Sequence, residues 1–263
     1  MNRIALVTGA SSGIGEAFAR LLAACSHDLI LTARRGDRLT ALAAELEHAY
    51  GVAVDVVVAD LGTAGGRDVV AGVVESQPID LLVNNAGFGV YAPVAETDPA
   101  VLDAMIQLNV LAVMHLTRAA LPGMLERRSG SVINVASGLA FDPTATRATY
   151  SGTKAFVVNF TRAIDEEVRE QGIRVQVLIP GLIRTEFHDT SGTEIGAIPA
   201  GWLMDPTDLA AASLTGLERG EVVCVPALPD AGKVAAALDL QAALTRELVR
   251  FGASANRYRE TTN

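Results

Sequence analysis

The sequence predicts an α/β fold in which one doubly wound parallel sheet carries helices on both faces. Three observations predict it. Strand and helix patterns alternate along the chain, several strand-like runs are short and continuously apolar, and a glycine-rich turn separates the first strand from the first helix. Continuous apolar runs are typical of strands that are buried on both faces of a parallel sheet. Alternating strands and helices form right-handed βαβ units, which build such a sheet.

The expected strands and helices follow one another in a regular order. Strands are expected at 3–8, 27–33, 52–58, 79–83, 131–137, 173–179 and 221–225. Helices are expected at 13–25, 37–50, 65–76, 98–128, 149–171 and 206–219, with a C-terminal helix at about 230–250. The long helix 98–128 should bend near Asn109, and Pro122 should kink it or begin a separate turn. This order predicts a Rossmann-like sheet of about seven strands.

Length and composition predict a single domain that covers residues 1–263. Half of the residues are hydrophobic, which is enough for a large core. The stretch from Asp189 to Pro206 is rich in Gly, Pro and Thr and lacks periodicity, so a substrate loop is expected at about 186–206. The polar tail Ser254–Asn263 is expected to fray.

Charge and cysteine content argue against several classes of partner. The net charge is −9 and there is no stripe of Lys and Arg, so we expect no nucleic-acid partner. No strand-like run approaches the roughly 20 apolar residues of a membrane span, and we expect no signal peptide and no membrane partner. Cys25 and Cys224 lack metal-ligand spacing, which predicts two reduced core thiols in a cytoplasmic protein and no metal site.

The glycine-rich turn has the residues that a dinucleotide site needs. Gly9, Gly13 and Gly15 follow a strand and open a helix, and Ser11 and Ser12 add hydroxyl donors. Glycine lets the backbone approach a pyrophosphate, and the helix N-terminus attracts its negative charge. The spacing Gly-x-x-x-Gly-x-Gly differs from the commonest dinucleotide motif, and a tight strand-to-helix turn alone also favours glycine.

The end of the second strand indicates which dinucleotide is bound. An NAD site has an acidic residue here that binds the ribose hydroxyls, whereas this chain has Ala33 followed by Arg34 and Arg35. A guanidinium pairs with a 2′-phosphate, so the sequence favours NADP(H). The alternative is that both arginines are solvated surface charges. Asp37 is the nearest acid, but it lies past the turn and favours the start of the next helix.

Two further strand ends carry polar or small residues. Asp60 and Leu61 end the third strand, and the carboxylate there could accept a hydrogen bond from an adenine amino group. The sequence Asn84-Asn85-Ala86-Gly87 ends the fourth strand, where asparagines can bond neighbouring strand ends and Ala-Gly leaves room for a ribose. Either pair can also be explained by turn chemistry alone.

Three residues predict a proton-transfer site. Tyr150 and Lys154 are four residues apart and therefore share a face of helix 149–171, and Ser137 ends the strand before that helix. A neighbouring ammonium should lower the pKa of the tyrosine, which is ordinarily near 10. The Ser137 hydroxyl could hold a substrate carbonyl oxygen beside the phenol. The alternative is a half-buried tyrosine with a solvated lysine.

Together these motifs resemble the short-chain dehydrogenase/reductase family, in its shorter single-domain branch. The resemblance covers residues 3 to about 225 and follows the family's order. The matching pieces are Thr8-Gly9-Ala10-Ser11-Ser12-Gly13-Ile14-Gly15, Asp60-Leu61, Asn84-Asn85-Ala86-Gly87, Asn109, Ser137, Tyr150-Ser151-Gly152-Thr153-Lys154 and Pro180-Gly181-Leu182-Ile183-Arg184-Thr185.

The resemblance implies a role for each matching residue. Tyr150 would be the general acid/base, and Lys154 would lower its pKa and bind the nicotinamide ribose. Ser137 would orient the substrate oxygen, and Asn109 would hold a water that connects Lys154 to solvent. The implied cofactor-binding residues are Gly9, Ser11, Ser12, Gly13, Ile14, Gly15, Arg34, Arg35, Asp60, Leu61, Asn85, Ala86, Gly87, Tyr150, Lys154, Pro180, Gly181, Ile183 and Thr185. Ile183 and Thr185 would contact the nicotinamide carboxamide.

The chain departs from the family's pattern in two places. The usual Ser-Ser pair is Ala136-Ser137 here, which keeps the serine that is spaced from Tyr150. The last strand reads Gly220-Glu221-Val222-Val223-Cys224-Val225-Pro226 instead of ending in a glycine pair at a tetramer contact. This second departure argues against the usual tetramer and a fatty-acid substrate.

The substrate pocket is expected to be mostly apolar. Its candidate walls are Phe88, Val90, Tyr91, Leu139, Phe141 and the segment 187–202. Arg147 could meet an anionic group, although a solvated loop arginine is the more ordinary interpretation. His188 is expected to be an exposed loop residue.

The sequence therefore predicts an NADP(H)-dependent enzyme that interconverts a ketone or aldehyde and an alcohol by hydride transfer. Alternatives are an NAD-dependent alcohol dehydrogenase, a regulator that binds NADP(H) without turnover, and a nucleotide-sugar epimerase or dehydratase. The resemblance also predicts a homodimer or homotetramer built on helices 98–128 and 149–171. The apolar stripe Val157, Phe160, Ile164 and Val168 could instead face the protein's own sheet.

Overall fold

The computed structural model describes residues 3–188, 196 and 198–250. They divide into two units, Met1–Ala227 and Leu228–Asn263, which are considered separately. Among the described residues, the first unit contains every strand, and the second contains helix α9 (Ala231–Leu248), within the range expected for the last helix. The expected polar tail lies outside the described residues.

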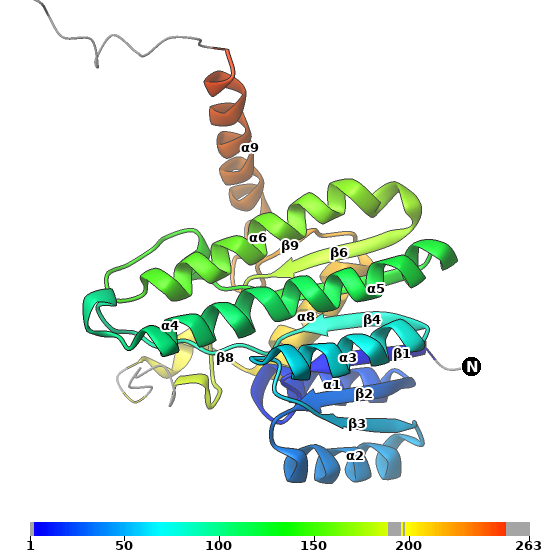
Figure 1. Ribbon diagram of the computed structural model, residues 1–263. Helices are drawn as coiled ribbons and strands as arrows, with labels where there is room; N and C mark the ends of the chain where they lie inside the picture. The colour runs from blue at the N-terminus through cyan, green and yellow to red at the C-terminus, as the bar shows by residue number, and fades with distance from the viewer. Residues whose placement is uncertain (1–2, 189–195, 197, 251–263) are drawn as a thin grey trace, which may run out of the picture. The chain divides into compact units, whose positions relative to one another are not determined.

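A seven-stranded sheet forms the centre of the first unit, with strand order β3-β2-β1-β4-β5-β6-β9 (Figure 1). All its neighbouring pairs are parallel. The strands are β1 (Arg3–Thr8), β2 (His27–Ala33), β3 (Val54–Val58), β4 (Ile79–Asn84), β5 (Gly130–Val135), β6 (Ile173–Leu178) and β9 (Val223–Cys224). The order reverses between β1 and β4, which confirms the doubly wound, Rossmann-like fold and places a ligand crevice at that point.

Helices cover both faces of the sheet, and α3, α5 and α6 lie in front of it in Figure 1. The α-helices of the first unit are α1 (Gly13–Ala24), α2 (Gly36–Tyr50), α3 (Ala64–Ser76), α4 (Pro99–Ile106), α5 (Val113–Arg127), α6 (Ala148–Val168) and α8 (Pro206–Glu218). Short 3-10 turns lie at Val94–Glu96, Gly138–Ala140, Arg169–Gln171 and Ala200–Trp202.

Strand side chains alternate between two hydrophobic layers, as the two-residue period of a strand requires. Ala5 and Val7 pack with residues of α1, α2 and α8, whereas Leu6 packs with residues of α3, α5 and α6. Ile164 and Val168 of the α6 stripe belong to the second layer, Val157 to a third cluster, and Phe160 packs against both. This stripe therefore faces the protein's own core, which was the alternative to a subunit contact.

Capping residues fix where several helices begin and end. Asp98 and Asp205 accept hydrogen bonds from the first turns of α4 and α8, and a proline follows each of them. Gly51 ends α2 with a φ of 68°, a left-handed conformation that favours glycine. These signals explain why the helix limits lie within a few residues of those expected.

The expected helix 98–128 is continuous but changes its winding. A π-helical stretch, Gln107–Ala112, lies between α4 and α5 and contains Asn109, where a bend was expected. Such stretches insert an extra residue per turn and occur often at functional sites. The expectation of a separate turn at Pro122 is wrong, because Pro122 lies inside α5. Leu116, Ala120 and Met124 anchor this helix in the core on either side of the proline.

A buried polar network ties the sheet to α5 and α6. Asn84 donates to Asn134 Oδ1 on the next strand (2.9 Å) and to Thr117 Oγ1 of α5 (3.1 Å). Asn134 donates in turn to Thr161 Oγ1 of α6 (3.0 Å). Since buried amides need partners, this network favours one position of α6 on the sheet.

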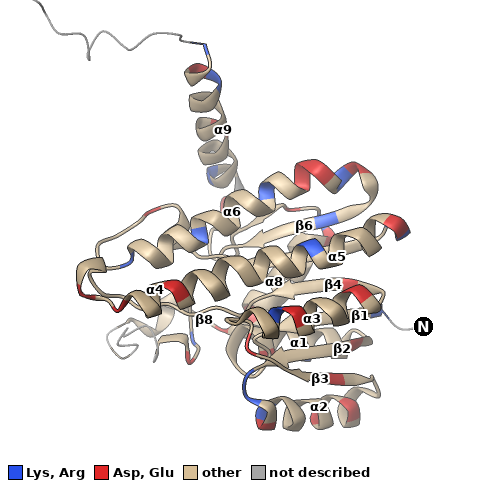
Figure 2. Ribbon diagram, viewed as in Figure 1, with Lys and Arg blue, Asp and Glu red and all other residues tan. Residues whose placement is uncertain are grey.

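One helical stretch, Pro99–Arg127, is long and apolar enough to cross a membrane by length and composition alone. Core helices pass the same test, and buried residues of this stretch pack in the layer formed with α3 and α6. The charged residues of the described chain are spread over many elements, with Lys and Arg gathered at the start of α2 (Figure 2).

Two sequence-based expectations need correction. Cys224 is buried as expected, but Cys25 is exposed because it caps the C-terminal end of α1 instead of lying within it. The segment expected to be irregular contains β8 (Leu203–Met204), which pairs with β7 (Leu182–Ile183) in a small parallel sheet. Residues 189–195 and 197 of that segment lie outside the described residues.

Candidate active site

A cavity of about 570 Å³ lies at the carboxyl ends of the central strands. It brings together parts of the chain that are far apart in sequence, including the glycine-rich turn, the loop after β2, the end of β5 and the start of α6. Of the predicted site residues, it is lined by Gly9, Ser11, Ser12, Gly13, Ile14, Arg34, Arg35, Asp60, Leu61, Asn85, Ala86, Gly87, Ser137, Tyr150, Lys154, Pro180, Gly181, Ile183 and Thr185.

The glycine-rich turn is shaped by close backbone approach. Gly9 and Gly13 have φ values of 67° and 58°, which favour glycine. A Cβ on Gly9 would lie 2.8 Å from Asn85 Nδ2, and one on Gly15 would lie 2.4 Å from the Gly9 carbonyl oxygen. Gly15 does not line the cavity, so its smallness serves packing beneath the turn. The backbone of this turn lines the cavity at the N-terminus of α1, which fits a pyrophosphate.

The strand ends β1 and β4 are locked together beside this turn. Asn85 donates through its side chain to the Thr8 carbonyl oxygen (2.9 Å), and the Thr8 hydroxyl accepts from the backbone N–H groups of Asn85 and Ala86. These bonds confirm that an asparagine here connects neighbouring strand ends. They hold the floor of the cavity in place without occupying it.

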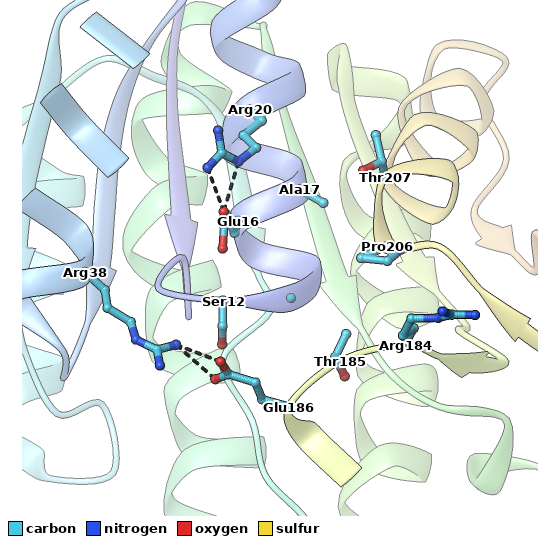
Figure 3. A pocket seen from close by; sticks show the side chains of 11 residues that line it. Ser12, Glu16, Ala17, Arg20, Arg38, Arg184, Thr185, Glu186, Pro206 and Thr207 are labelled. Carbon is cyan, nitrogen blue, oxygen red and sulfur yellow. Dashed lines mark hydrogen bonds and ion pairs between the residues drawn. The ribbon is translucent and has the colours of Figure 1, made fainter. Parts of the chain in front are cut away.

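Four charged residues gather where β2 leaves the sheet. Two of them, Arg38 and Glu186, were not predicted from the sequence. Arg34 is exposed and lines the cavity. Arg35 donates to Ser11 Oγ (3.1 Å), Ser12 Oγ (2.7 Å) and Glu186 (2.9 Å). Arg38 donates to the same carboxylate (Figure 3). Arg38 lies only three residues after Arg35 in the first turn of α2, a spacing that a search for neighbouring cations could have used.

Tyr150 is buried in the wall of the cavity at the start of α6. Its ring lies 5.7 Å from the rings of both Tyr91 and Phe187. Burial raises the pKa of Tyr150, Tyr91 adds to this effect, and a hydrogen bond with Ser137 opposes it. The expected lowering by Lys154 is not found, because the groups that shift this pKa are the burial of the phenol, Tyr91 and Ser137. The phenol stays protonated at neutral pH.

Lys154 is buried beneath Tyr150. Its ammonium lies 5.8 Å from the centre of the Tyr150 ring and donates to the Val135 carbonyl oxygen (2.9 Å). Burial lowers the pKa of Lys154 to about 8. The ammonium is thus close enough to stabilise negative charge in the cavity, and it titrates near physiological pH.

Asn109 lies behind the cavity and does not line it. Its side chain bonds Phe88 through both the backbone N–H (3.1 Å) and the carbonyl oxygen (2.8 Å), and it donates to Thr153 Oγ1 (3.2 Å). A Cβ on Gly87 would lie 3.0 Å from Asn109 Oδ1 and 3.5 Å from Lys154 Nζ, so Asn109 is a neighbour of Lys154. Its side chain fixes the loop after β4, a contact that the sequence did not predict.

The walls around Tyr150 are largely apolar, and Phe88, Tyr91, Leu139 and Phe187 line them as expected. Val90, Phe141 and the described residues 196 and 198–202 do not line the cavity, although they were expected in its wall. Among them, Trp202 is 70% exposed.

Arg147 and His188 differ from their more ordinary sequence-based interpretations. The Arg147 guanidinium lies over the Tyr91 ring, 4.6 Å from its centre, and lines the cavity. His188 is buried instead of exposed, because its Nε2 bonds the Ile183 carbonyl oxygen (2.8 Å) and folds the segment back on itself. Among residues 3–188, 196 and 198–250, no three His, Cys, Asp or Glu side chains could hold a metal ion together.

Comparison with known proteins identifies the class that this fold and cavity define. Residues 3–195 match the short chain dehydrogenase family. The chain belongs to this family, whose members are oxidoreductases that act on small molecules with NAD(P) cofactors.

Similar proteins of several kinds are known. A short-chain dehydrogenase from Sphingobium yanoikuyae, solved in complex with NADPH, superposes with a TM-score of 0.93 at 33% identity, covering 98% of this chain and 100% of the other. The bulky-bulky ketone specific alcohol dehydrogenase from Comamonas testosteroni gives a TM-score of 0.89 at 30% identity, with 98% and 99% covered. The very-long-chain 3-oxoacyl-CoA reductase of Anas platyrhynchos is 37% identical over 71% of this chain, a match that spans 62% of that reductase.

Proposed function

We propose that this protein uses NADP(H) to interconvert a ketone or aldehyde and the corresponding alcohol. The observation that carries the proposal is that Ser137, Tyr150 and Lys154 line the same cavity as the glycine-rich turn. A site that holds a dinucleotide at one end and a proton donor at the other can couple hydride transfer to proton transfer. The 3-oxoacyl-CoA reductase and the bulky-ketone dehydrogenase are similar proteins whose names point to carbonyl substrates.

Each residue of the site would have a distinct part. Ser137 would donate a hydrogen bond to the substrate oxygen, and Tyr150, protonated at neutral pH, would give that oxygen its proton. Lys154 would stabilise the phenolate that remains. When bound, NADPH supplies the hydride. Asn109, through its bonds to Phe88, would hold the loop that covers Lys154.

The cofactor would lie along the rest of the cavity. The backbone of Gly9 and Gly13 and the hydroxyls of Ser11 and Ser12 would hold the pyrophosphate. Asp60 and Leu61 would meet the adenine, while Ile183 and Thr185 would meet the carboxamide. Arg34 and Arg35 would bind a 2′-phosphate, which favours NADP(H) over NAD(H). The NADPH complex of the Sphingobium enzyme supports this choice by similarity.

The walls favour a bulky, mostly apolar carbonyl compound. Phe88, Tyr91, Leu139 and Phe187 line the same cavity as Tyr150, and the rings of Tyr91 and Phe187 neighbour its ring. Apolar walls with a few polar groups are typical of sites for such ligands. A homodimer or homotetramer and a cytoplasmic location stay predictions.

Replacing Arg34 by Asp should reverse the cofactor preference. Loss of the guanidinium and addition of a carboxylate should weaken NADPH binding by about 10- to 100-fold, the range of a charged hydrogen bond, and leave NADH binding far less changed. Fluorescence titration of both cofactors measures this. Arg219→Asp, at the end of α8 and away from the cavity, is the control with the same charge change. An unchanged preference in Arg34→Asp would show that Arg34 does not recognise the phosphate.

The activity itself is tested by NADPH consumption with ketones of increasing bulk, from methyl ketones to diaryl ketones. Turnover that rises with substituent size supports the apolar-wall argument. Clear NADPH binding with no turnover of any carbonyl or alcohol would favour the non-catalytic regulator instead.

A further inference from the structure

Glu186 occupies an unusual position beside the proposed phosphate site. It accepts hydrogen bonds from Arg35 Nη1 (2.9 Å) and from Arg38 Nη1 (2.8 and 3.1 Å). The two arginines flank the start of α2, whereas Glu186 comes from the segment after β7, about 150 residues further along the chain. Figure 3 shows Arg38 reaching across from α2 to this carboxylate.

The position of Arg35 makes this contact relevant to the cofactor. Its remaining bonds are to Ser11 and Ser12, so the guanidinium lies directly over the glycine-rich turn. Both Arg35 and Glu186 also line the cavity that holds this turn. A phosphate that approaches the arginines therefore meets a carboxylate that is already paired with them.

We propose that Glu186 is an internal competitor of the cofactor's 2′-phosphate and thereby sets the NADP(H)/NAD(H) preference, with Arg38 as a third cation of the phosphate site. A 2′-phosphate and a carboxylate repel each other when they share two guanidiniums. The phosphate must therefore displace Glu186, whereas NAD(H), which lacks that phosphate, need not. The inference rests on the proposed NADP(H) function.

The charge state of Glu186 supports competition across the working pH range. Arg35, and next to it Arg38, lower the pKa of Glu186 to about 2. The carboxylate is consequently ionised at any pH at which the protein would be assayed. A change of pH therefore does not release Glu186 from the arginines. A competing anion or added salt can, since the Glu186 side chain is 49% exposed and open to screening.

The segment that carries Glu186 also reaches the reacting end of the cavity. Thr185 packs on the glycine-rich turn, where a Cβ on Gly13 would lie 3.0 Å from its Cγ2. Phe187 contacts the Tyr150 ring on the other side. Exchange of Glu186 for phosphate thus takes place between two residues that border the cofactor and the substrate.

The test is calorimetric titration of the full chain with NADP⁺ and with NAD⁺, in the absence of substrate. Glu186→Gln keeps the shape of the side chain and removes its charge. It should tighten NADP⁺ binding by about fivefold, the upper end for an exposed ion pair, and change NAD⁺ binding much less. The gain should shrink as salt is added.

Two further variants make the result specific. Glu45→Gln removes the same charge from α2, where Glu45 pairs with Arg20 and does not line the cavity. It should leave NADP⁺ affinity unchanged. Arg38→Gln should weaken NADP⁺ binding. In the Arg38→Gln background, the gain in NADP⁺ affinity from Glu186→Gln should differ from the gain in the unmodified chain, because the two residues act on one another.

The outcomes separate this inference from the proposed function. If the unmodified chain binds NADP⁺ and Glu186→Gln leaves its affinity unchanged or weaker, Glu186 is no competitor and the inference fails alone. An equal gain for NAD⁺ also overturns it. If the unmodified chain binds neither nucleotide, the proposed function fails and the inference fails with it.

Discussion

Replacing Tyr150 by Phe is expected to lower carbonyl reduction severely while NADPH affinity stays close to that of the unmodified chain. The change removes only the hydroxyl, and the ring contacts with Tyr91 and Phe187 remain. Because the phenol would supply the proton to the substrate oxygen, its loss should lower kcat/KM by about 10²- to 10⁴-fold. Steady-state kinetics and NADPH titration measure the two quantities separately.

The protonation state of Tyr150 fits the reducing direction. A phenol that is protonated at neutral pH is ready to act as an acid in the reducing direction. Tyr50→Phe, at the exposed end of α2, provides a matched control that should keep full activity. Activity of Tyr150→Phe within a few-fold of the unmodified chain would assign the proton to another group.

Replacing Lys154 by Met is expected to lower turnover by about 10²-fold or more, the effect of removing one group that stabilises developing charge. The ammonium lies 5.8 Å from the centre of the Tyr150 ring and donates a hydrogen bond to the Val135 carbonyl oxygen. Folding stability should not fall, since a desolvated ammonium costs free energy that an apolar side chain of similar length does not. Kinetics and thermal unfolding test both statements.

The pH profile distinguishes Lys154 from a merely structural residue. Its pKa of about 8 means that the positive charge is present below about pH 8 and is lost as the pH rises through that value. In the unmodified chain, kcat/KM for reduction should therefore fall above about pH 8, and Lys154→Met should lack this fall. Lys233→Met, at the only other lysine of the chain, is the control. An alkaline fall that persists in Lys154→Met would contradict the assignment.

The sequence was sufficient for features that depend on local pattern. The apolar runs and glycine turn predicted the sheet, and capping residues such as Asp98 and Asp205 mark the helix starts. The predicted motifs come together because each follows the carboxyl end of a strand, and parallel strands place those ends at one edge. Gly15 and Asn109 were the exceptions, since they act from behind the cavity wall.

Features that depend on tertiary packing were not predictable. The Glu186 contact joins residues about 150 positions apart, and His188 is buried only because the segment folds back on Ile183. The pKa of Tyr150 depends on how much water its ring loses, which spacing from Lys154 does not reveal. Pro122 continues within a helix because surrounding core contacts hold α5 in place.

The most direct measurement is the transfer of label from NADPH to product. The chain is incubated with a bulky ketone and NADPH that carries deuterium at one or the other face of nicotinamide C4, and the alcohol is analysed by mass spectrometry. The account predicts deuterium in the alcohol from one face only, and about 10²- to 10⁴-fold slower labelling with Tyr150→Phe. Unlabelled alcohol from both forms of the cofactor, or no alcohol from any carbonyl despite bound NADPH, would contradict it.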